Sequence, residues 1–414
     1  MNSVWQDTAR LPSFGRLEKD IRTDVLVIGG GMAGLLCTYL LTQASVDCAL
    51  AEAETLCGGV TKNTTAKITS QHGLIYDGLI RCFGEEKALL YLFDFEEKAS
   101  YVYSKSDTPK LERELSALRR LGFPAEYVKR LPLPFPTAGA VKFPRQAQMN
   151  PLKFAAAVSK GLPVYEHTPV RELAGTTAVT DGGVIHAKKI IAATHFPFLN
   201  KHGLYFLKMY QHRSYVFALE NAPDVGGMYV DETRDGLSLR NYKGLLLLGG
   251  GGHRTGKSGG GWRCLRDFAG RVCPVASEKF CWAAQDCMTL DGVPYIGRYA
   301  LGTENLYVAT GFQKWGMTSS MVSAMLLTQL VQKKQGPLQP LFSPSRSMLR
   351  PQLAINGFEA AVNLLTPGKK RCPHMGCALK WNPEEHSWDC PCHGSRFTED
   401  GRLIDNPAAG GLKK

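Results

Sequence analysis

Long apolar stretches are absent from this chain of 414 residues. It contains no run of about eighteen apolar residues, the length that a membrane-spanning helix requires. Its N-terminus lacks the charged and then apolar pattern of a secretory signal, and we find no internal repeat or low-complexity tract. We therefore expect a cytoplasmic, globular protein that is long enough to form more than one domain.

Basic residues outnumber acidic ones, yet they do not gather as they do on a nucleic-acid-binding surface. The 49 lysines and arginines exceed the 37 aspartates and glutamates and give a net charge of +12. They are spread along the chain without interleaved aromatic residues, which argues against a nucleic-acid partner. A basic face could attract an acidic electron-carrier protein or make peripheral contact with an anionic membrane, although solvated surface charge is the simpler explanation.

Cysteine, in contrast, occurs twelve times. Without a secretory signal, most of these residues are expected to be buried thiols. Near the C-terminus, however, four cysteines and two histidines share two short runs, Cys372-Pro-His374-Met-Gly-Cys377 and Cys390-Pro-Cys392-His393-Gly-Ser395. Such a set ligates an iron–sulfur cluster or a structural zinc ion, and the residue types leave both interpretations open.

The two runs, together with the residues after the second histidine, resemble the cluster loops of the Rieske [2Fe-2S] family. The resemblance implies that Cys372, His374, Cys390 and His393 are the cluster ligands and that Cys377 and Cys392 form a disulfide. Phe397 stands where high-potential members commonly have a tyrosine, which removes one hydrogen bond to a ligand sulfur. We therefore expect a reduction potential in the lower part of the Rieske span of roughly −150 to +300 mV.

The N-terminal part carries a dinucleotide-binding pattern. An apolar strand over residues 24–28 leads into Gly29-Gly-Gly31-Met32-Ala33-Gly34, and a helix over residues 35–44 is expected to follow. Glycines at this spacing let the backbone approach a pyrophosphate, whose charge the helix N-terminus favours. A second strand, over residues 47–51, ends in Glu52, whose carboxylate can bind a ribose hydroxyl. The pattern serves NAD and FAD alike.

Three further stretches are similar to the D-amino-acid, glycine and sarcosine oxidase family, which uses FAD. They are residues 58–67, the T-x-D-G-x-P-x-I-G pattern of residues 289–297, and the turn and helix after a strand over residues 306–310. The strand end at 190–195 is also similar, although His195 replaces the usual glycine. The resemblance implies an FAD site formed by Gly29, Gly31, Met32, Ala33, Gly34, Glu52, Thr61, Thr65, Val170, Ala193, Gly311, Gly316, Met317 and Thr318.

The same family usually holds a substrate carboxylate with a basic residue over the flavin. Lys67 and Arg213 are the candidates that the resemblance offers here, and the catalytic residues stay unknown. Some relatives attach FAD covalently through a cysteine, for which Cys287 is an unfavoured candidate because its offset differs.

We predict an α/β (α+β) fold in four parts: an N-terminal arm in residues 1–23, an FAD-dependent oxidoreductase domain in 24–335, a proline-rich linker in 336–368 and a shortened, all-β Rieske domain in 369–414. The second part combines a Rossmann-like, doubly wound unit with a β-rich substrate unit around residues 201–248. Three local expectations are a strand pair formed by residues 164–165 and 168–170, a flexible loop at 249–257 and a short helix at 357–365.

Together the motifs predict an FAD-dependent oxidoreductase that oxidises a small amine or amino-acid-like substrate. A flavin takes up two electrons, whereas a Rieske centre moves one at a time, so we expect electrons to pass through the cluster to a carrier protein or a quinone. Two alternatives stay open: a reductase component that works in the opposite direction, and an FAD oxidase with a zinc-binding or structural tail.

Overall fold

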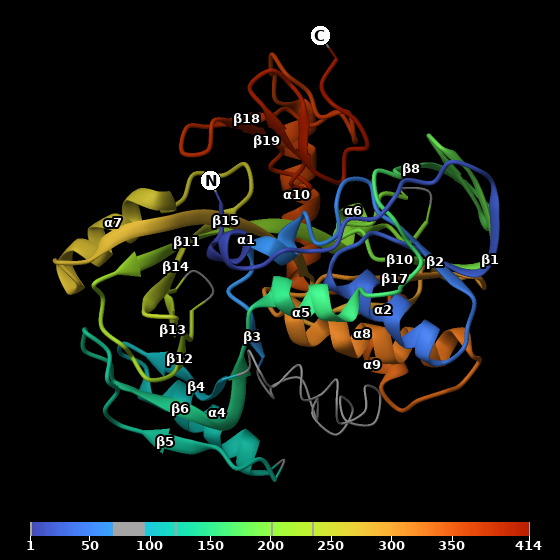
Figure 1. The fold of residues 1–414 in the computed structure, drawn as a ribbon. Helices are drawn as coiled ribbons and strands as arrows, with labels where there is room; N and C mark the ends of the chain where they lie inside the picture. Colours follow the sequence, from blue (N-terminus) through green and yellow to red (C-terminus); the bar gives the residue numbers. More distant parts are fainter. Residues whose placement is uncertain (1, 69–95, 121, 200–201, 234–235, 414) are drawn as a thin grey trace.

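The computed structural model describes residues 2–68, 96–120, 122–199, 202–233 and 236–413, which fold around three β-sheets (Figure 1). The first sheet is mostly parallel, the second is large and mainly antiparallel, and the third is a small meander at the C-terminus. This arrangement confirms the predicted mixed α/β fold with a small C-terminal β-unit.

The first sheet forms the doubly wound unit. Strand β1 lies at its centre and pairs in parallel with β2 and β10, as buried strands of α/β proteins do. The helix after β1, α2, is apolar all round and packs against α8, so ten of its residues are buried. The strands are β16 (Tyr295–Arg298), β17 (Leu306–Thr310), β10 (Gly183–Ala192), β1 (Ile21–Ile28), β2 (Cys48–Ala51), β7 (Val164–Tyr165), β8 (Val170–Ala174) and β9 (Thr177–Thr180).

The second sheet forms the predicted β-rich unit. Its longest strands, β11 and β15, pair with each other along almost their whole length, and β14 joins β11 on the other side. The strands are β15 (Ser277–Thr289), β11 (Met209–Glu220), β14 (Leu245–Arg254), β13 (Ser238–Tyr242), β12 (Met228–Asp231), β4 (Glu96–Ser104), β6 (Gly139–Gln148), β3 (Lys67–Ile68) and β5 (Glu126–Val128).

Helices connect and cover these sheets. In Figure 1, α2, α5 and α8 lie together beside the first sheet, and α7 lies at the far end of the second. The helices are α1 (Val4–Thr8), α2 (Met32–Gln43), the 3-10 turn η1 (Val60–Asn63), α4 (Thr108–Arg120), α5 (Pro151–Val158), α6 (Tyr205–Lys208), α7 (Gly261–Val272), α8 (Gly316–Val331), α9 (Gln339–Phe342) and α10 (Pro351–Leu365). Within the described part of the chain, none of them is long and apolar enough to cross a bilayer.

The C-terminal sheet follows α10, which lies beneath it in Figure 1. Its strands run in sequence order as β18 (Lys380–Asn382), β19 (Ser387–Asp389), β20 (Arg396–Thr398) and β21 (Leu403–Asp405). The buried apolar core of this unit consists mainly of its four cysteines, with Leu379, Phe397 and Ala408.

Two local predictions were wrong, and one predicted helix proved longer than expected. Strand β7 pairs with β2, and β8 pairs with β9, so residues 164–165 and 168–170 do not pair with each other. The glycines of residues 249–252 continue strand β14 to Arg254 because β11 pairs with this stretch as far as Arg254, while β13 reaches Gly249. Helix α10 starts six residues earlier than expected, with a proline in its first turn, where the missing N–H costs nothing.

Candidate functional site

A cavity of about 1740 Å³ lies where the first and second sheets meet. Residues that follow the carboxyl ends of β1, β2 and β10 line one side, which is where parallel α/β sheets bind ligands. Residues of β11, β14 and β15 line another side, and residues 402–406 and 408–410 of the C-terminal unit complete the wall.

The glycine turn at the start of α2 borders this cavity. Gly29 has a φ of +103°, and a Cβ atom on Gly34 would lie 1.9 Å from the Gly29 carbonyl oxygen, so neither position tolerates a side chain. The Met32 N–H at the helix start donates to Thr61 Oγ1 at 3.0 Å. The glycine turn and the first residues of α2 line the cavity, which places the helix N-terminus where a pyrophosphate is favoured.

Glu52 stands at the end of β2, beside the glycine turn. Its carboxylate accepts hydrogen bonds from the N–H groups of Gly30, at 2.5 Å, and Glu54, at 2.9 Å. Burial raises the pKa of this carboxyl, and the two N–H donors oppose the increase. The position suits the predicted contact with a ribose hydroxyl.

The structure brings most of the predicted FAD-binding residues to one cavity. Those that line it are Gly29, Gly31, Met32, Ala33, Glu52, Thr61, Thr65, Val170, Ala193, Gly316 and Met317. Gly34, Gly311 and Thr318 lie behind the lining. Gly311 shapes its turn, because its φ is +74° and a Cβ atom there would lie 2.3 Å from Thr289 Cγ2.

Lys67, the first substrate-binding candidate, is buried and lines the cavity. Its ammonium group donates to Thr65 Oγ1 at 3.2 Å and Ser238 Oγ at 3.1 Å. Burial, reinforced by the positive charge of Arg240, lowers the pKa of Lys67 to about 7. A cation held only by neutral hydroxyls in these contacts suits an anionic ligand.

Arg213, the second candidate, does not line the cavity, and this placement corrects the prediction. Its guanidinium forms a two-pronged ion pair with Glu385 of the C-terminal unit, with Nε 2.9 Å from one carboxylate oxygen and Nη2 bound to the other. A carboxylate oxygen of Asp405 also lies 4.0 Å from Arg213 Nη1. Sequence patterns could not reveal a partner 172 residues away along the chain.

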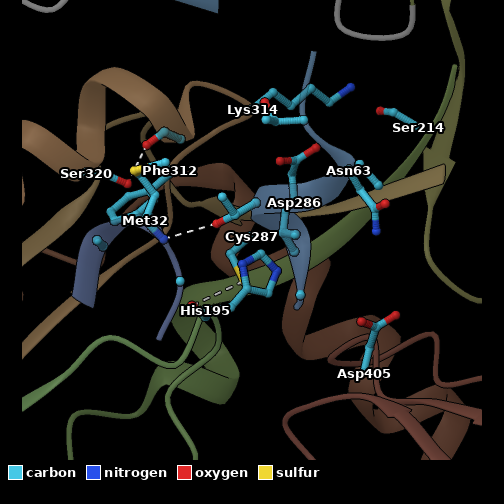
Figure 2. A pocket seen from close by; sticks show the side chains of 18 of the residues that line it. Met32, Asn63, His195, Ser214, Asp286, Cys287, Phe312, Lys314, Ser320 and Asp405 are labelled. Atoms are coloured by element: carbon cyan, nitrogen blue, oxygen red, sulfur yellow. Dashed lines mark hydrogen bonds between the residues drawn. The ribbon is translucent and has the colours of Figure 1, made fainter. Parts of the chain in front are cut away.

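Several charged residues at the cavity were missed by the sequence analysis. Figure 2 shows His195, Asp286 and Lys314 around it, together with Asn63 and Asp405. Burial raises the pKa of Asp286, against the opposing charge of Lys314, and burial also lowers the pKa of His195. Lys314 lies in the turn after the strand over residues 306–310, whose resemblance to the oxidase family was a usable signal, whereas an aspartate inside a strand carries none.

Cys287 also faces this space, in strand β15. Its Sγ lies 3.6 Å from the carbonyl oxygen of His195, and burial raises its pKa well above the ordinary value. A protonated, buried thiol is a poor nucleophile, which does not favour covalent attachment of a flavin here.

The predicted cluster ligands come together in two similar turns. The Gly376 N–H bonds to the Cys372 carbonyl, and the Gly394 N–H bonds to the Cys390 carbonyl. The Nδ1 atoms of His374 and His393 are 3.3 Å apart. Burial lowers the pKa of these imidazoles to about 4 and about 3, so both stay neutral and keep a nitrogen lone pair for a metal.

All four cysteines of the turns lie in the core of the C-terminal unit. The ligand atoms of Cys377, Cys390 and His393 lie within 4.8 Å of one another. Cys377 and Cys392 are both free thiols in the structure, which therefore does not contain the predicted disulfide. The Cys377 side chain nevertheless contacts those of Cys390 and Cys392, and these contacts, the one with Cys390 most, lower the pKa of Cys377.

A network of buried amides joins the histidine loop to the cavity. Gln211 donates through Nε2 to the His393 carbonyl at 2.9 Å, and its Oε1 lies 3.2 Å from His195 Nε2. Gln285 donates to the same Gln211 Oε1 and to the Gly394 carbonyl. The ring of Phe196 meets those of His374 and His393 edge-on, and the ring of Phe206 meets that of His393. The histidine end of the predicted cluster thus faces the cavity-bearing units.

Arg254, at the end of β14, reaches the same loop from the second sheet. Its guanidinium donates to the carbonyls of Pro391, at 3.2 Å, and Cys392, at 3.3 Å, and to Asn356 Oδ1 at 3.1 Å. It also lies over the ring of Tyr210. A permanent positive charge is therefore held beside the cysteine-bearing loop.

Comparison with known proteins accounts for nearly the whole chain. A family model described as FAD dependent oxidoreductase matches residues 24–330, and a Rieske [2Fe-2S] domain model matches residues 365–414. YhfW of Bacillus subtilis, named as a Rieske 2Fe-2S iron-sulfur protein, is 34% identical over 100% of this chain and 97% of its own.

Two further matches concern single parts of the chain. Cytochrome b6-f complex iron-sulfur subunit 3 of Nostoc is 48% identical over 42 residues, which are 10% of this chain and 24% of that subunit. Among solved structures, glycine oxidase from Geobacillus kaustophilus has a TM-score of 0.68 at 22% identity, covering 79% of this chain and 99% of that chain, and so shares the fold.

These matches imply FAD and a [2Fe-2S] cluster as the cofactors, and the residues fit both groups. The cavity combines a side-chain-free glycine turn, helix N-terminal donors and a carboxylate at the end of the second strand. The C-terminal turns supply converging thiols and neutral imidazoles. The predicted set Cys372, His374, Cys390 and His393 stays a prediction.

Proposed function

The chain belongs to the FAD dependent oxidoreductase family and ends in a Rieske [2Fe-2S] domain, and from this premise we propose that it oxidises a small amine or amino-acid-like substrate and delivers the electrons through the cluster to an external acceptor. When bound, FAD supplies a two-electron acceptor and the cluster a one-electron carrier. The chain's own residues bind the substrate and join the two sites.

Basic and acidic side chains around the cavity support an amino-acid-like substrate. Lys67 and Lys314 are basic groups suited to a carboxylate, and Asp286 carries a carboxyl group that can accept a hydrogen bond from an amine. Figure 2 shows Asp286 and Lys314 next to each other, and the charge of Lys314 acts on the Asp286 carboxyl. Burial strengthens such pairings because water screens them less.

His195 and Asp286 are the candidates for handling the proton that an amine releases on oxidation. Burial favours the neutral form of each, which raises the pKa of Asp286 and lowers that of His195. Their pKa values therefore shift toward one another, which makes proton exchange between the two groups easier.

The contact between the C-terminal domain and the cavity is the observation that carries the electron-delivery proposal. Gln211 connects the His393 backbone to the His195 ring by two hydrogen bonds. Asn406 of the same domain donates to the carbonyls of Thr194 and Phe196, on either side of His195. A path of bonded and hydrogen-bonded atoms thus runs from cavity to cluster loop without crossing solvent.

Anaerobic mixing of the purified protein with glycine, sarcosine, proline and simple amines tests the proposal. Absorbance follows the flavin, and EPR of frozen samples follows the cluster. We expect at least one compound to reduce both cofactors, and the reduced-cluster signal to grow as the flavin is reoxidised.

A Gln211→Leu variant provides the matched comparison, since leucine keeps the bulk of the side chain but not its hydrogen bonds. It should reduce its flavin normally and its cluster slowly. If substrate bleaches the flavin while the cluster stays oxidised and peroxide forms in air, the protein is an oxidase and electron delivery to the cluster is excluded.

A further inference from the structure

Helix α10 buries its polar face and exposes its apolar face, the reverse of an ordinary surface helix. The side chains of Asn356 and Asn363 are only 3% exposed, and Glu359 beside them forms a 2.7 Å ion pair with Lys257. Asn356 donates to the Leu207 carbonyl at 3.0 Å and accepts from Arg254. The polar face of the helix is therefore the one that packs against the protein.

The opposite face of α10 is apolar, and the described residues of the chain leave it exposed. Ile355, Phe358, Val362 and Leu365 follow one another at helical spacing on one stripe, with exposed fractions of 51%, 69%, 40% and 83%. Single exposed apolar residues are common on protein surfaces, but a contiguous apolar stripe is costly in water unless something covers it.

Basic residues flank this stripe. Arg350 immediately precedes the helix, and Lys369, Lys370 and Arg371 follow it. Between Arg350 and Arg371 the sole acidic residue is Glu359, whose charge is already paired on the inner face. An apolar stripe with cations at its ends matches the chemistry of an anionic bilayer surface, where the apolar residues enter the acyl boundary and the cations meet phosphates.

We propose that α10 docks this protein on an anionic membrane surface, with Ile355, Phe358, Val362 and Leu365 entering the bilayer interface. The same contact would bring the cluster loop to the lipid. Arg371 donates to the carbonyls of Leu364, at 3.0 Å, and Gly376, at 2.8 Å, which ties the end of the helix to the loop of His374. This inference does not depend on the proposed reaction.

Co-sedimentation of the full-length holoprotein with vesicles tests it. One set of vesicles contains equal parts of phosphatidylglycerol and phosphatidylcholine, and the other contains phosphatidylcholine alone. We expect binding to the anionic set, weaker binding to the neutral set, and partial release at high salt because the charges are screened and the apolar contact is not.

A Phe358→Ser/Leu365→Ser double variant should bind anionic vesicles about ten-fold or more weakly, because two large apolar groups no longer leave water. Leu301→Ser is the matched control: it removes a residue that is 87% exposed in a turn outside α10, and binding should not change. Flavin absorbance and iron content report on the folding of each variant.

Three results overturn the proposal: no binding of the wild-type protein to anionic vesicles, equal binding by the folded double variant, or equal loss in the Leu301→Ser control. Light scattering identifies a second copy as the occupant if the wild-type protein is a dimer, the double variant is a monomer, and neither binds vesicles.

Discussion

The dinucleotide-binding unit and the C-terminal domain hold their sites in opposite ways. The first surrounds its glycine turn with an extensive apolar core from both sheets and from α2 and α8. The second has a core made mainly of its four cysteines, with few other apolar side chains. A domain this small buries too little surface to be stable without a metal or a neighbour. The C-terminal fold therefore depends on its cofactor and on its interface.

Ion pairs hold the C-terminal domain against the second sheet, whereas apolar packing holds the dinucleotide-binding unit together. Arg213 and Arg396 are 4% and 5% exposed and share Glu385, while Arg396 also pairs with Asp389 and Asp405. Such a network is expensive to bury but specifies one orientation, because removing one partner leaves a charge unpaired.

Removing a predicted ligand should have the largest effect and should be confined to one side of the comparison. We expect Cys390→Ser to lose the cluster and make the C-terminal domain sensitive to protease, while FAD stays bound. Iron content, flavin absorbance and limited proteolysis check this. Cys264→Ser, at an exposed thiol outside the cluster loops, should keep both cofactors. Full iron content in the Cys390 variant would refute the ligand assignment.

Breaking the ionic interface comes next. Glu385→Ala leaves Arg213 with only the more distant Asp405 and removes one of the three carboxylates around Arg396, and should destabilise the docked C-terminal domain by about 3 kcal/mol. Chemical unfolding followed separately by cluster and flavin absorbance measures it. The exposed pair Lys279–Glu220 offers a control, because Glu220→Ala should change stability by less than about 0.5 kcal/mol. Equal values for the two variants would contradict a docking role.

The pH dependence of ligand binding probes Lys67. Its pKa is lowered to about 7, so the side chain is charged below that pH and loses its proton above it. The affinity for a small carboxylate such as benzoate, read from flavin absorbance, should fall about ten-fold per pH unit above pH 7. Lys67→Arg keeps its charge and should show a flat profile. A flat profile in the wild-type protein would rule out the contact.

The smallest expected effect concerns the reduction potential. Arg254→Gln removes a positive charge from beside the cysteine-bearing loop and should lower the cluster potential by some tens of millivolts, because the reduced cluster is the more negative form. Arg254→Lys, which keeps the charge, should lie between the two. An EPR-monitored redox titration measures all three proteins. An unchanged potential in the Gln variant would mean that the C-terminal domain alone sets it.

Much of the fold could be read from short stretches. Strands β1 and β2, the glycine turn and α2 were expected close to where they lie, because their periodicity and turn residues are local. Strand pairing was harder to predict. Residues 164–165 were expected to pair with the nearby residues 168–170, but they form β7, which pairs with β2. The continuation of β14 through four glycines depended on its neighbours, which supply hydrogen bonds that glycine itself does not predict.

The sequence by itself determined which cofactors this protein is built to hold. The glycine turn, the oxidase-like stretches at 58–67 and 289–297 and the two cysteine–histidine loops each need only a few residues in a row, and their resemblance to known families decides for FAD and for an iron–sulfur cluster. Tertiary structure decided how the two sites meet. Gln211 reaches a carbonyl 182 residues away, Arg213 pairs across 172 residues, and the exposed stripe of α10 exists only because its polar face found partners. Such contacts follow from packing in three dimensions, which no local spacing encodes.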